Sequence, residues 1–192
     1  MEIMPLDQVP RAFREEACRA IFDFSIGLVK LHGSDLVHNA RLGGPGTLVQ
    51  IDGTYGILTA CHVLDHLKGE EAIGLILVNT VRPFLHRVTV RSERMRWVRI
   101  ACSDKEGDGP DLGILLLSPV DVGYLKAQKS FYNLANREWL LCDPPTLDTG
   151  VWFICGFPDE ATKERGPERG FKSVKVFEGA CGDVRVEKDY RV

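Results

Sequence analysis

Seven short apolar segments, each ended by turn residues, constrain the fold of this chain more than any other feature of its sequence. We predict strands at 25–31, 46–51, 56–60, 71–78, 86–91, 95–102 and 111–118. Asp52-Gly53 lies between the second and third segments, and Asp-Gly between two apolar runs is a strong hairpin signal. Only one short helical turn, at 62–68, interrupts the series. The pattern therefore favours an antiparallel β barrel over a βαβ sheet.

The segments outside this series predict a less regular structure. Asp7 can cap a short helix at about 9–21, which would be an addition to the barrel. Residues 34–45 contain several glycines and read as a loop. Pro119 ends the first unit, and residues 119–150 then make a crossing with a possible helical turn at 122–128.

The last part of the chain offers too few strands for a second barrel. We find only three candidates, at 151–156, 172–178 and 183–187. An unclosed barrel leaves strand edges without partners, so pairing with another chain across such an edge is possible. The sequence also ends on an alternating apolar pattern without a turn. We therefore expect this chain to be the front piece of a longer protein.

Composition narrows the class of protein. The chain has 192 residues, of which 44% are hydrophobic and 27% charged, as in an ordinary soluble domain. A formal net charge of −3 gives no attraction to nucleic acid or to an anionic membrane. No run of 18 apolar residues and no secretory signal at 1–14 is present. We expect a cytoplasmic protein with no membrane or nucleic-acid partner.

The six cysteines show no spacing typical of a disulfide framework or a metal site. Cys102, Cys142 and Cys155 lie in apolar strand segments, where a free cysteine behaves as a small buried hydrophobic residue. This distribution favours a reducing compartment over a disulfide-stabilised fold.

Two weaker patterns suggest other kinds of site. Five arginines between 87 and 99 alternate with apolar residues, which could form a nucleic-acid face but is explained more simply by an exposed strand face. His62 and His66 stand four residues apart with Asp65 between them, which is metal-ligand spacing on a helix. No convincing further ligand follows, so we predict no metal and no cofactor.

The candidate functional residues are His62 and Asp111. His62 follows a predicted strand, and Asp111 opens the very apolar segment 111–118. A histidine followed along the chain by an aspartate is the order of base and orienting acid in one type of Ser-His-Asp triad. Alone, such residues are more often structural, but their position after a hairpin and before a strand favours catalysis.

Four motifs carry a resemblance to a known family. Residues 46–49 (Gly-Thr-Leu-Val), 59–62 (Thr-Ala-Cys-His) and 111–115 (Asp-Leu-Gly-Ile-Leu) resemble the N-terminal signatures of trypsin-like peptidases. Gly-Phe-Pro at 156–158 resembles a turn common in the bacterial members. The resemblance spans about residues 43 to 158. It implies a mainly β, chymotrypsin-like antiparallel double β-barrel with a short N-terminal helix, whose second barrel is incomplete here.

The resemblance also implies a division of the chain and roles for the site residues. Residues 1–24 would be an N-terminal helical extension, 25–118 the first β-barrel, and 119–192 the crossover with a partial second barrel. His62 would take the proton of a serine hydroxyl, and Asp111 would orient the imidazole and stabilise its charged form. The substrate would be a peptide or protein.

The nucleophile of such a site is missing from the sequence. No Gly-x-Ser-Gly follows Asp111, and the downstream serines Ser118, Ser130 and Ser173 lack flanking glycines. Cys181, between Gly179-Ala180 and Gly182, resembles the nucleophile motif of viral cysteine peptidases of this fold, but a glycine-bearing turn explains it as well. We therefore expect this chain by itself to be inactive. A non-catalytic, peptidase-like module that binds a peptide or protein partner is the alternative.

Overall fold

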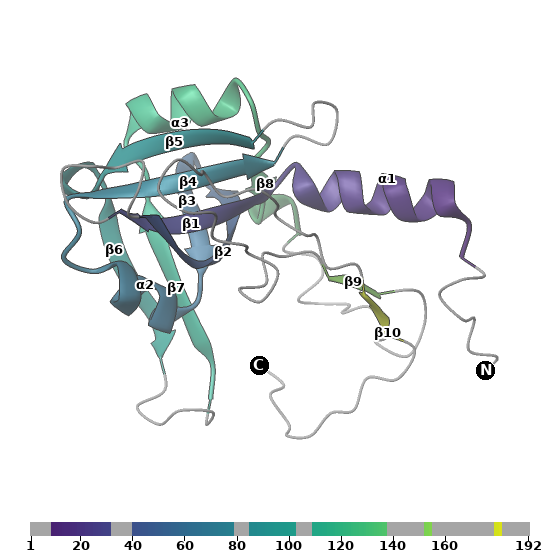
Figure 1. Ribbon diagram of the computed structural model, residues 1–192, viewed down its shortest axis with the longest axis horizontal. Helices are drawn as coiled ribbons and strands as arrows, with labels where there is room; N and C mark the ends of the chain where they lie inside the picture. The colour runs from purple at the N-terminus through teal and green to yellow at the C-terminus, as the bar shows by residue number, and fades with distance from the viewer. Residues whose placement is uncertain are drawn as a thin grey trace.

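The computed structural model describes residues 9–31, 40–78, 85–102, 109–137, 152–154 and 179–181. Within them, an eight-stranded, almost entirely antiparallel sheet follows one N-terminal helix, α1 (Arg11–Phe22) (Figure 1). The strands of this sheet are β1 (Ser25–Leu31), β2 (Ala40–Ile51), β3 (Thr54–Thr59), β4 (Ala72–Val78), β5 (Leu85–Arg91), β6 (Arg96–Cys102), β7 (Asp111–Leu116) and β8 (Tyr132–Asn133). The predicted mainly β fold with a short N-terminal helix is confirmed.

The order of strands in the sheet leaves it open. Neighbouring strands follow the order β5-β4-β1-β2-β3-β7-β6, so β5 and β6 are the two edges. The chain passes from one edge to the other through a single 3₁₀ turn, η2 (Ser92–Arg94). The prediction of a closed first barrel is wrong in this respect. The edges are joined by a bend of the backbone and not by a ladder of hydrogen bonds.

The most informative difference from the sequence-based prediction is the length of β2. Residues 40–45, predicted as part of a loop, belong to this strand and pair with β1. The β1–β2 register shifts between Leu28 and Val29, which accommodates an extra residue at Gly43. Gly44 has a φ of 150°, which is strained for other residues. The glycines that led to the prediction of a loop here belong instead to a bulged strand.

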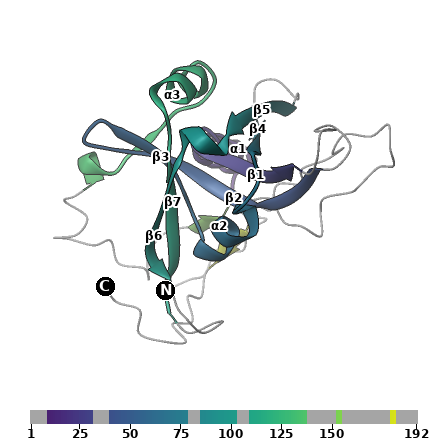
Figure 2. The same ribbon diagram turned by 90° about the vertical axis from the view of Figure 1, so that its left-hand side faces the viewer.

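The interior of the sheet forms one main core. Its fully buried members include Ile26, Leu28, Leu48, Ile57 and Leu115. Two short helices lie on opposite sides of the strands, α2 (Cys61–Leu67) and α3 (Pro119–Lys126) (Figures 1 and 2). Both insert apolar side chains into the same cluster, and these helical residues are Val63, Leu64, Leu67 and Leu125.

The segments before and after the predicted barrel both contact it. Helix α1 begins after Pro10, with no side-chain cap, and buries Cys18 and Phe22. Asp7, predicted as its cap, lies outside the described residues. Strand β8 pairs in parallel with β2, with Val49 opposite Tyr132, so residues beyond 118 extend the first sheet.

Two further strands form a separate small pair. Strand β9 (Trp152–Ile154) pairs antiparallel with β10 (Gly179–Cys181). Residues 179–181 are thus strand, and the prediction of a turn is wrong for them. The predicted strands at 172–178 and 183–187 lie outside the described residues.

Candidate functional site

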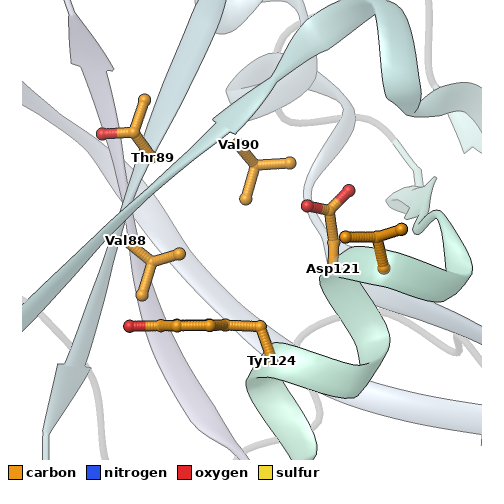
Figure 3. Close-up of a pocket in the computed structure, with 6 residues that line it drawn as sticks. Val88, Thr89, Val90, Asp121 and Tyr124 are labelled. Atoms are coloured by element: carbon orange, nitrogen blue, oxygen red, sulfur yellow. The ribbon is translucent and has the colours of Figure 1, made fainter.

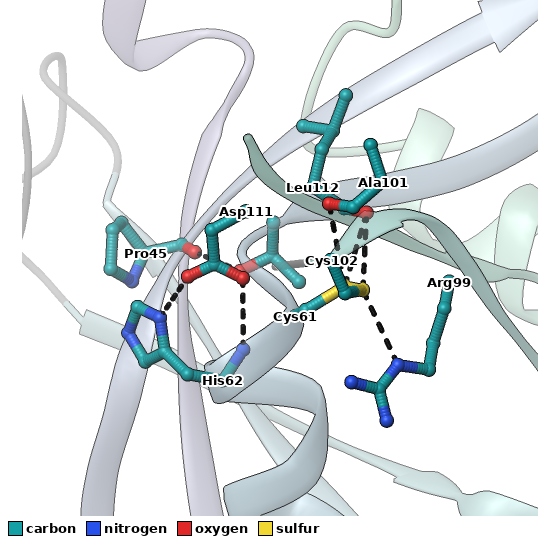
Figure 4. Close-up of polar contacts among 9 residues, drawn as sticks. Pro45, Cys61, His62, Arg99, Ala101, Cys102, Asp111 and Leu112 are labelled. Atoms are coloured by element: carbon teal, nitrogen blue, oxygen red, sulfur yellow. Dashed lines mark hydrogen bonds and ion pairs between the residues drawn. A yellow bond between two sulfur atoms is a disulfide. The ribbon is translucent and has the colours of Figure 1, made fainter. Parts of the chain in front are cut away.

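The structure brings together the two residues that the sequence singled out. The Nδ1 atom of His62 is hydrogen-bonded to Oδ2 of Asp111, although 49 residues separate them along the chain (Figure 4). The backbone N–H of His62 donates a second hydrogen bond, of 3.2 Å, to Oδ1 of the same carboxylate. The predicted contact is confirmed. Because both carboxylate oxygens are bonded, the orientation of Asp111 relative to the histidine is fixed.

The position of His62 follows from how α2 sits on the sheet. A β-carbon added at Gly44 of β2 would lie 2.6 Å from Val63, and one at Gly113 of β7 would lie 2.4 Å from Leu64. Only glycines at these points let a seven-residue helix approach the strands so closely. Gly43 serves in the same way, because an added β-carbon would lie 3.0 Å from Leu67. Gly43, Gly44 and Gly113 therefore form the surface on which the helix packs.

The hydrogen bonds of the pair determine its protonation. The bond from the His62 side chain lowers the pKa of the Asp111 carboxyl, and the backbone N–H groups of His62 and Cys61 lower it further. Partial desolvation opposes this lowering of the pKa. An ionised Asp111 can only accept hydrogen bonds, so Nδ1 of His62 carries the proton. In the neutral form of the imidazole, Nε2 is then the nitrogen that can accept a proton from elsewhere.

Both side chains of the pair are accessible to solvent. The exposed fractions are 75% for His62 and 40% for Asp111. Two apolar side chains on the adjoining strands are exposed as well, Ile100 of β6 at 53% and Leu112 of β7 at 37%. Both members of the pair are therefore within reach of another molecule or segment.

A disulfide lies directly beside the pair. It joins Cys61, the first residue of α2, to Cys102, the last residue of β6, across 5.9 Å between their Cα atoms (Figure 4). Cys102 stands opposite Asp111 in the β6–β7 ladder. The interpretation of Cys102 as a free buried cysteine is wrong, and the preference for a reducing compartment loses its support at these two cysteines. Cys142 and Cys155 lie outside the described residues.

Polar contacts hold the second half of α2 against the strands. Near the disulfide, Nη1 of Arg99 lies 3.4 Å from Oδ1 of Asp65, and its Nε donates to the Cys102 sulfur at 3.3 Å. On the next residue of the helix, the backbone carbonyl of His66 accepts a hydrogen bond of 3.0 Å from Nζ of Lys30, which also pairs with Glu70 at 3.1 Å. Asp65, considered above as a metal ligand, is thus bound to an arginine.

The serines that could be tested as nucleophiles lie elsewhere. Ser118 caps α3, where its hydroxyl donates to Asp121 at 2.5 Å. Since Asp111 opens β7 and Ser118 follows the end of that strand, the length of the strand separates them. The backbone N–H of Ser130 bonds to Asp23 at the end of α1. Ser173 lies outside the described residues, and Cys181 is described only as part of the backbone pair with β9.

A hollow lined by β5 and α3 is distinct from the pair. It has a volume of about 320 Å³ and lies between β5 and α3 (Figure 3). Val88 and Val90 form its strand side, and Asp121 and Tyr124 form its helix side. The Asp121 carboxylate already accepts the hydrogen bond from Ser118. This hollow is therefore not a continuation of the His62–Asp111 site.

Comparison with known proteins gives no family for the chain. No protein-family model, no curated protein and no solved structure matches it. Among the described residues, no three His, Cys, Asp or Glu side chains gather closely enough to hold a metal ion. No helix in that part of the chain has the length and apolar character needed to cross a membrane.

Proposed function

We propose that His62 and Asp111 are the base and the orienting acid of a trypsin-like peptidase of chymotrypsin-like fold, which hydrolyses peptide bonds with a serine nucleophile. The observation that carries this proposal is the doubly bonded Asp111 carboxylate. One of its oxygens accepts from the His62 ring and the other from the His62 backbone N–H. A histidine with only a structural role on a helix would not require two hydrogen bonds to one carboxylate.

Each residue then has a definite task. Nε2 of His62 accepts the proton of the nucleophile as it attacks the peptide carbonyl, which turns a poorly reactive hydroxyl into a good nucleophile. Asp111 keeps Nδ1 protonated, so that Nε2 is the free acceptor, and stabilises the imidazolium that forms. The exposure of His62 on one face leaves room for the nucleophile and the substrate.

The order of the strands supports the same proposal. His62 is the second residue of α2, the helix that follows β3 (Thr54–Thr59), and Asp111 opens β7, the neighbour of β3 in the sheet. Helix α2, which packs against β7, thus positions the base, and the start of β7 positions the acid. This is the arrangement expected of a catalytic pair, whose geometry must be kept within fractions of an ångström.

A binding module is the second candidate function, and the exposed apolar side chains favour it. Ile100 and Leu112 lie on the strands beside the pair and would suit contact with a peptide or protein partner. In that case the absence of a Gly-x-Ser-Gly segment is a property of the protein itself. His62 and Asp111 would then serve only to order the end of the sheet.

Hydrolysis by the natural product of the gene, purified at its natural length, distinguishes the two functions. We expect it to cleave fluorogenic peptides and to be labelled by a serine-directed phosphonate, and we expect His62→Ala to abolish both. Asp111→Asn should lower the turnover rate by about 10³–10⁴-fold, because it removes the acceptor that sets the histidine tautomer. The isolated 192-residue chain should be inactive.

Two neighbouring residues provide matched controls. His66→Ala and Asp65→Asn change the other histidine and the other aspartate of α2 without touching the pair. Both variants should retain the activity. A folded natural protein with an intact pair and no hydrolysis would decide for the binding module. Hydrolysis that depends on Cys181 and His62 would instead identify a cysteine peptidase.

A further inference from the structure

We propose that the Cys61–Cys102 disulfide is a clamp that positions Asp111 against His62. The bond joins the residue directly before His62 to the residue directly opposite Asp111 in the β6–β7 ladder. It therefore closes a small cycle that contains both members of the pair. Its meaning for catalysis rests on the proposed function, but the clamp itself is a statement about geometry and can be tested without hydrolysis.

The need for a clamp follows from the exposure of the pair. At 75% and 40% exposure, both side chains are open to solvent, and water competes for each of their hydrogen bonds. Asp111 is the first residue of β7 and Cys102 the last of β6, so the pair lies where the ladder ends. Strand ends open more readily than strand centres.

The disulfide fixes this end of the hairpin to the helix. The Cys61 sulfur is buried and lies 3.2 Å from the carbonyl oxygen of Leu112, the residue after Asp111. The neighbouring Arg99–Asp65 ion pair joins the same two elements, but it is exposed and therefore weak. Of these two links between α2 and β6, only the disulfide is not weakened by water.

Reduction of the bond should release the clamp. A thiolate of an added dithiol attacks the more accessible sulfur, that of Cys102, and Cys61 leaves as a thiolate and takes up a proton. The second thiol of the reagent then displaces the Cys102 sulfur, and the reagent becomes a cyclic disulfide. Two electrons pass to the protein, which gains two protons. The main core cluster contains neither cysteine and should remain folded.

Proton NMR of the 192-residue protein provides the test. The Nδ1–H proton of His62, bonded to a carboxylate, should give a resonance far downfield of the backbone amides, identified by its loss in His62→Ala. We expect the resonance in the oxidised protein and its disappearance after dithiothreitol. Cys102→Ala should lack it with or without dithiothreitol. Cys18→Ala, which removes a buried cysteine of α1, should behave as the wild type.

The outcomes separate the clamp from the proposed function. A resonance that persists unchanged after reduction, with alkylation of both cysteines verified by mass spectrometry, would overturn the clamp and leave the pair intact. Recovery of Cys61 and Cys102 as free thiols from protein purified without reductant would also overturn it. Absence of the resonance from the folded, oxidised protein would contradict the pair itself, and with it the proposed peptidase.

Discussion

Replacing Lys129 with methionine should change how the stability of the protein depends on pH. Lys129 is only 7% exposed, and its ammonium donates a hydrogen bond to the Phe22 carbonyl at the end of α1. Burial lowers the pKa of Lys129 from its ordinary value of 10.5 to about 8, against the opposing charge of Asp23. The folded protein therefore carries the charged Lys129 ammonium in buried surroundings that disfavour the charged form.

The sign and size of the effect follow from the two pKa values. Below about pH 8, Lys129 is charged in both states and the folded protein bears the full penalty. Between about pH 8 and 10.5 the unfolded chain binds a proton that the folded protein does not, so the free energy of unfolding rises with pH. At 1.36 kcal/mol per pKa unit the limit is about 3.4 kcal/mol. Partial hydration of the ammonium reduces this to about 1.5–2.5 kcal/mol.

Urea unfolding followed by circular dichroism at several pH values measures this dependence. Between pH 7.5 and 10.5 the wild type should gain about 1.5–2.5 kcal/mol relative to Lys129→Met, because the neutral methionine has no proton to lose. Lys68→Met, at an exposed position after α2, should run parallel to the wild type. A constant difference between the wild type and Lys129→Met over this range would refute the reasoning, since it would mean that the folded ammonium is as well hydrated as the unfolded one.

Two other predictions concern stability and can use the same urea assay. Lys30→Met should lower the free energy of unfolding by about 1–3 kcal/mol, because its ammonium lies 3.1 Å from Glu70 in a largely buried pair. Arg11→Met, which breaks an exposed pair, should leave the urea midpoint unchanged. Equal losses of stability in the two variants would contradict this ranking. Gly123→Ala should raise stability by about 0.5–1 kcal/mol, since an added methyl on α3 meets no atom. Gly44→Ala should lower the free energy of unfolding by about 2–4 kcal/mol, because φ is 150° and the methyl would lie 2.6 Å from a side-chain carbon of α2. Stability changes of the same sign in Gly123→Ala and Gly44→Ala would contradict the glycine argument.

Much of the sheet could be predicted because its strands are short, apolar and separated by clear turns. All seven segments predicted between 25 and 118 are strands, most of them within two residues of the expected bounds. The Asp52-Gly53 hairpin is present, with Ile51 paired with Thr54. The contact between His62 and Asp111 also follows from local signals, since each residue stands at the end of a strand that the sequence marks well.

The features that sequence reasoning missed depend on contacts between distant segments. Strand β2 starts at Ala40 because Gly43 and Gly44 fit beneath α2, which is visible only once the helix is in place. The disulfide was missed because a separation of 41 residues has no characteristic spacing. Helix α3 starts at Pro119, earlier than the helical turn predicted at 122–128, because Ser118 caps it. Capping serines before a proline are a signal that could have found it.

The distance along the chain between the two site residues has a consequence for how the protein folds. The β2–β3 hairpin closes over a two-residue turn, whereas β3 and β7 pair across a long intervening stretch of chain. Loop closure costs entropy, and contacts between remote segments tend to form late. We therefore expect His62 and Asp111, 49 residues apart, to come together late in folding. A nascent or half-folded chain has no assembled base, so any hydrolytic capacity of this site would be withheld until folding is nearly complete.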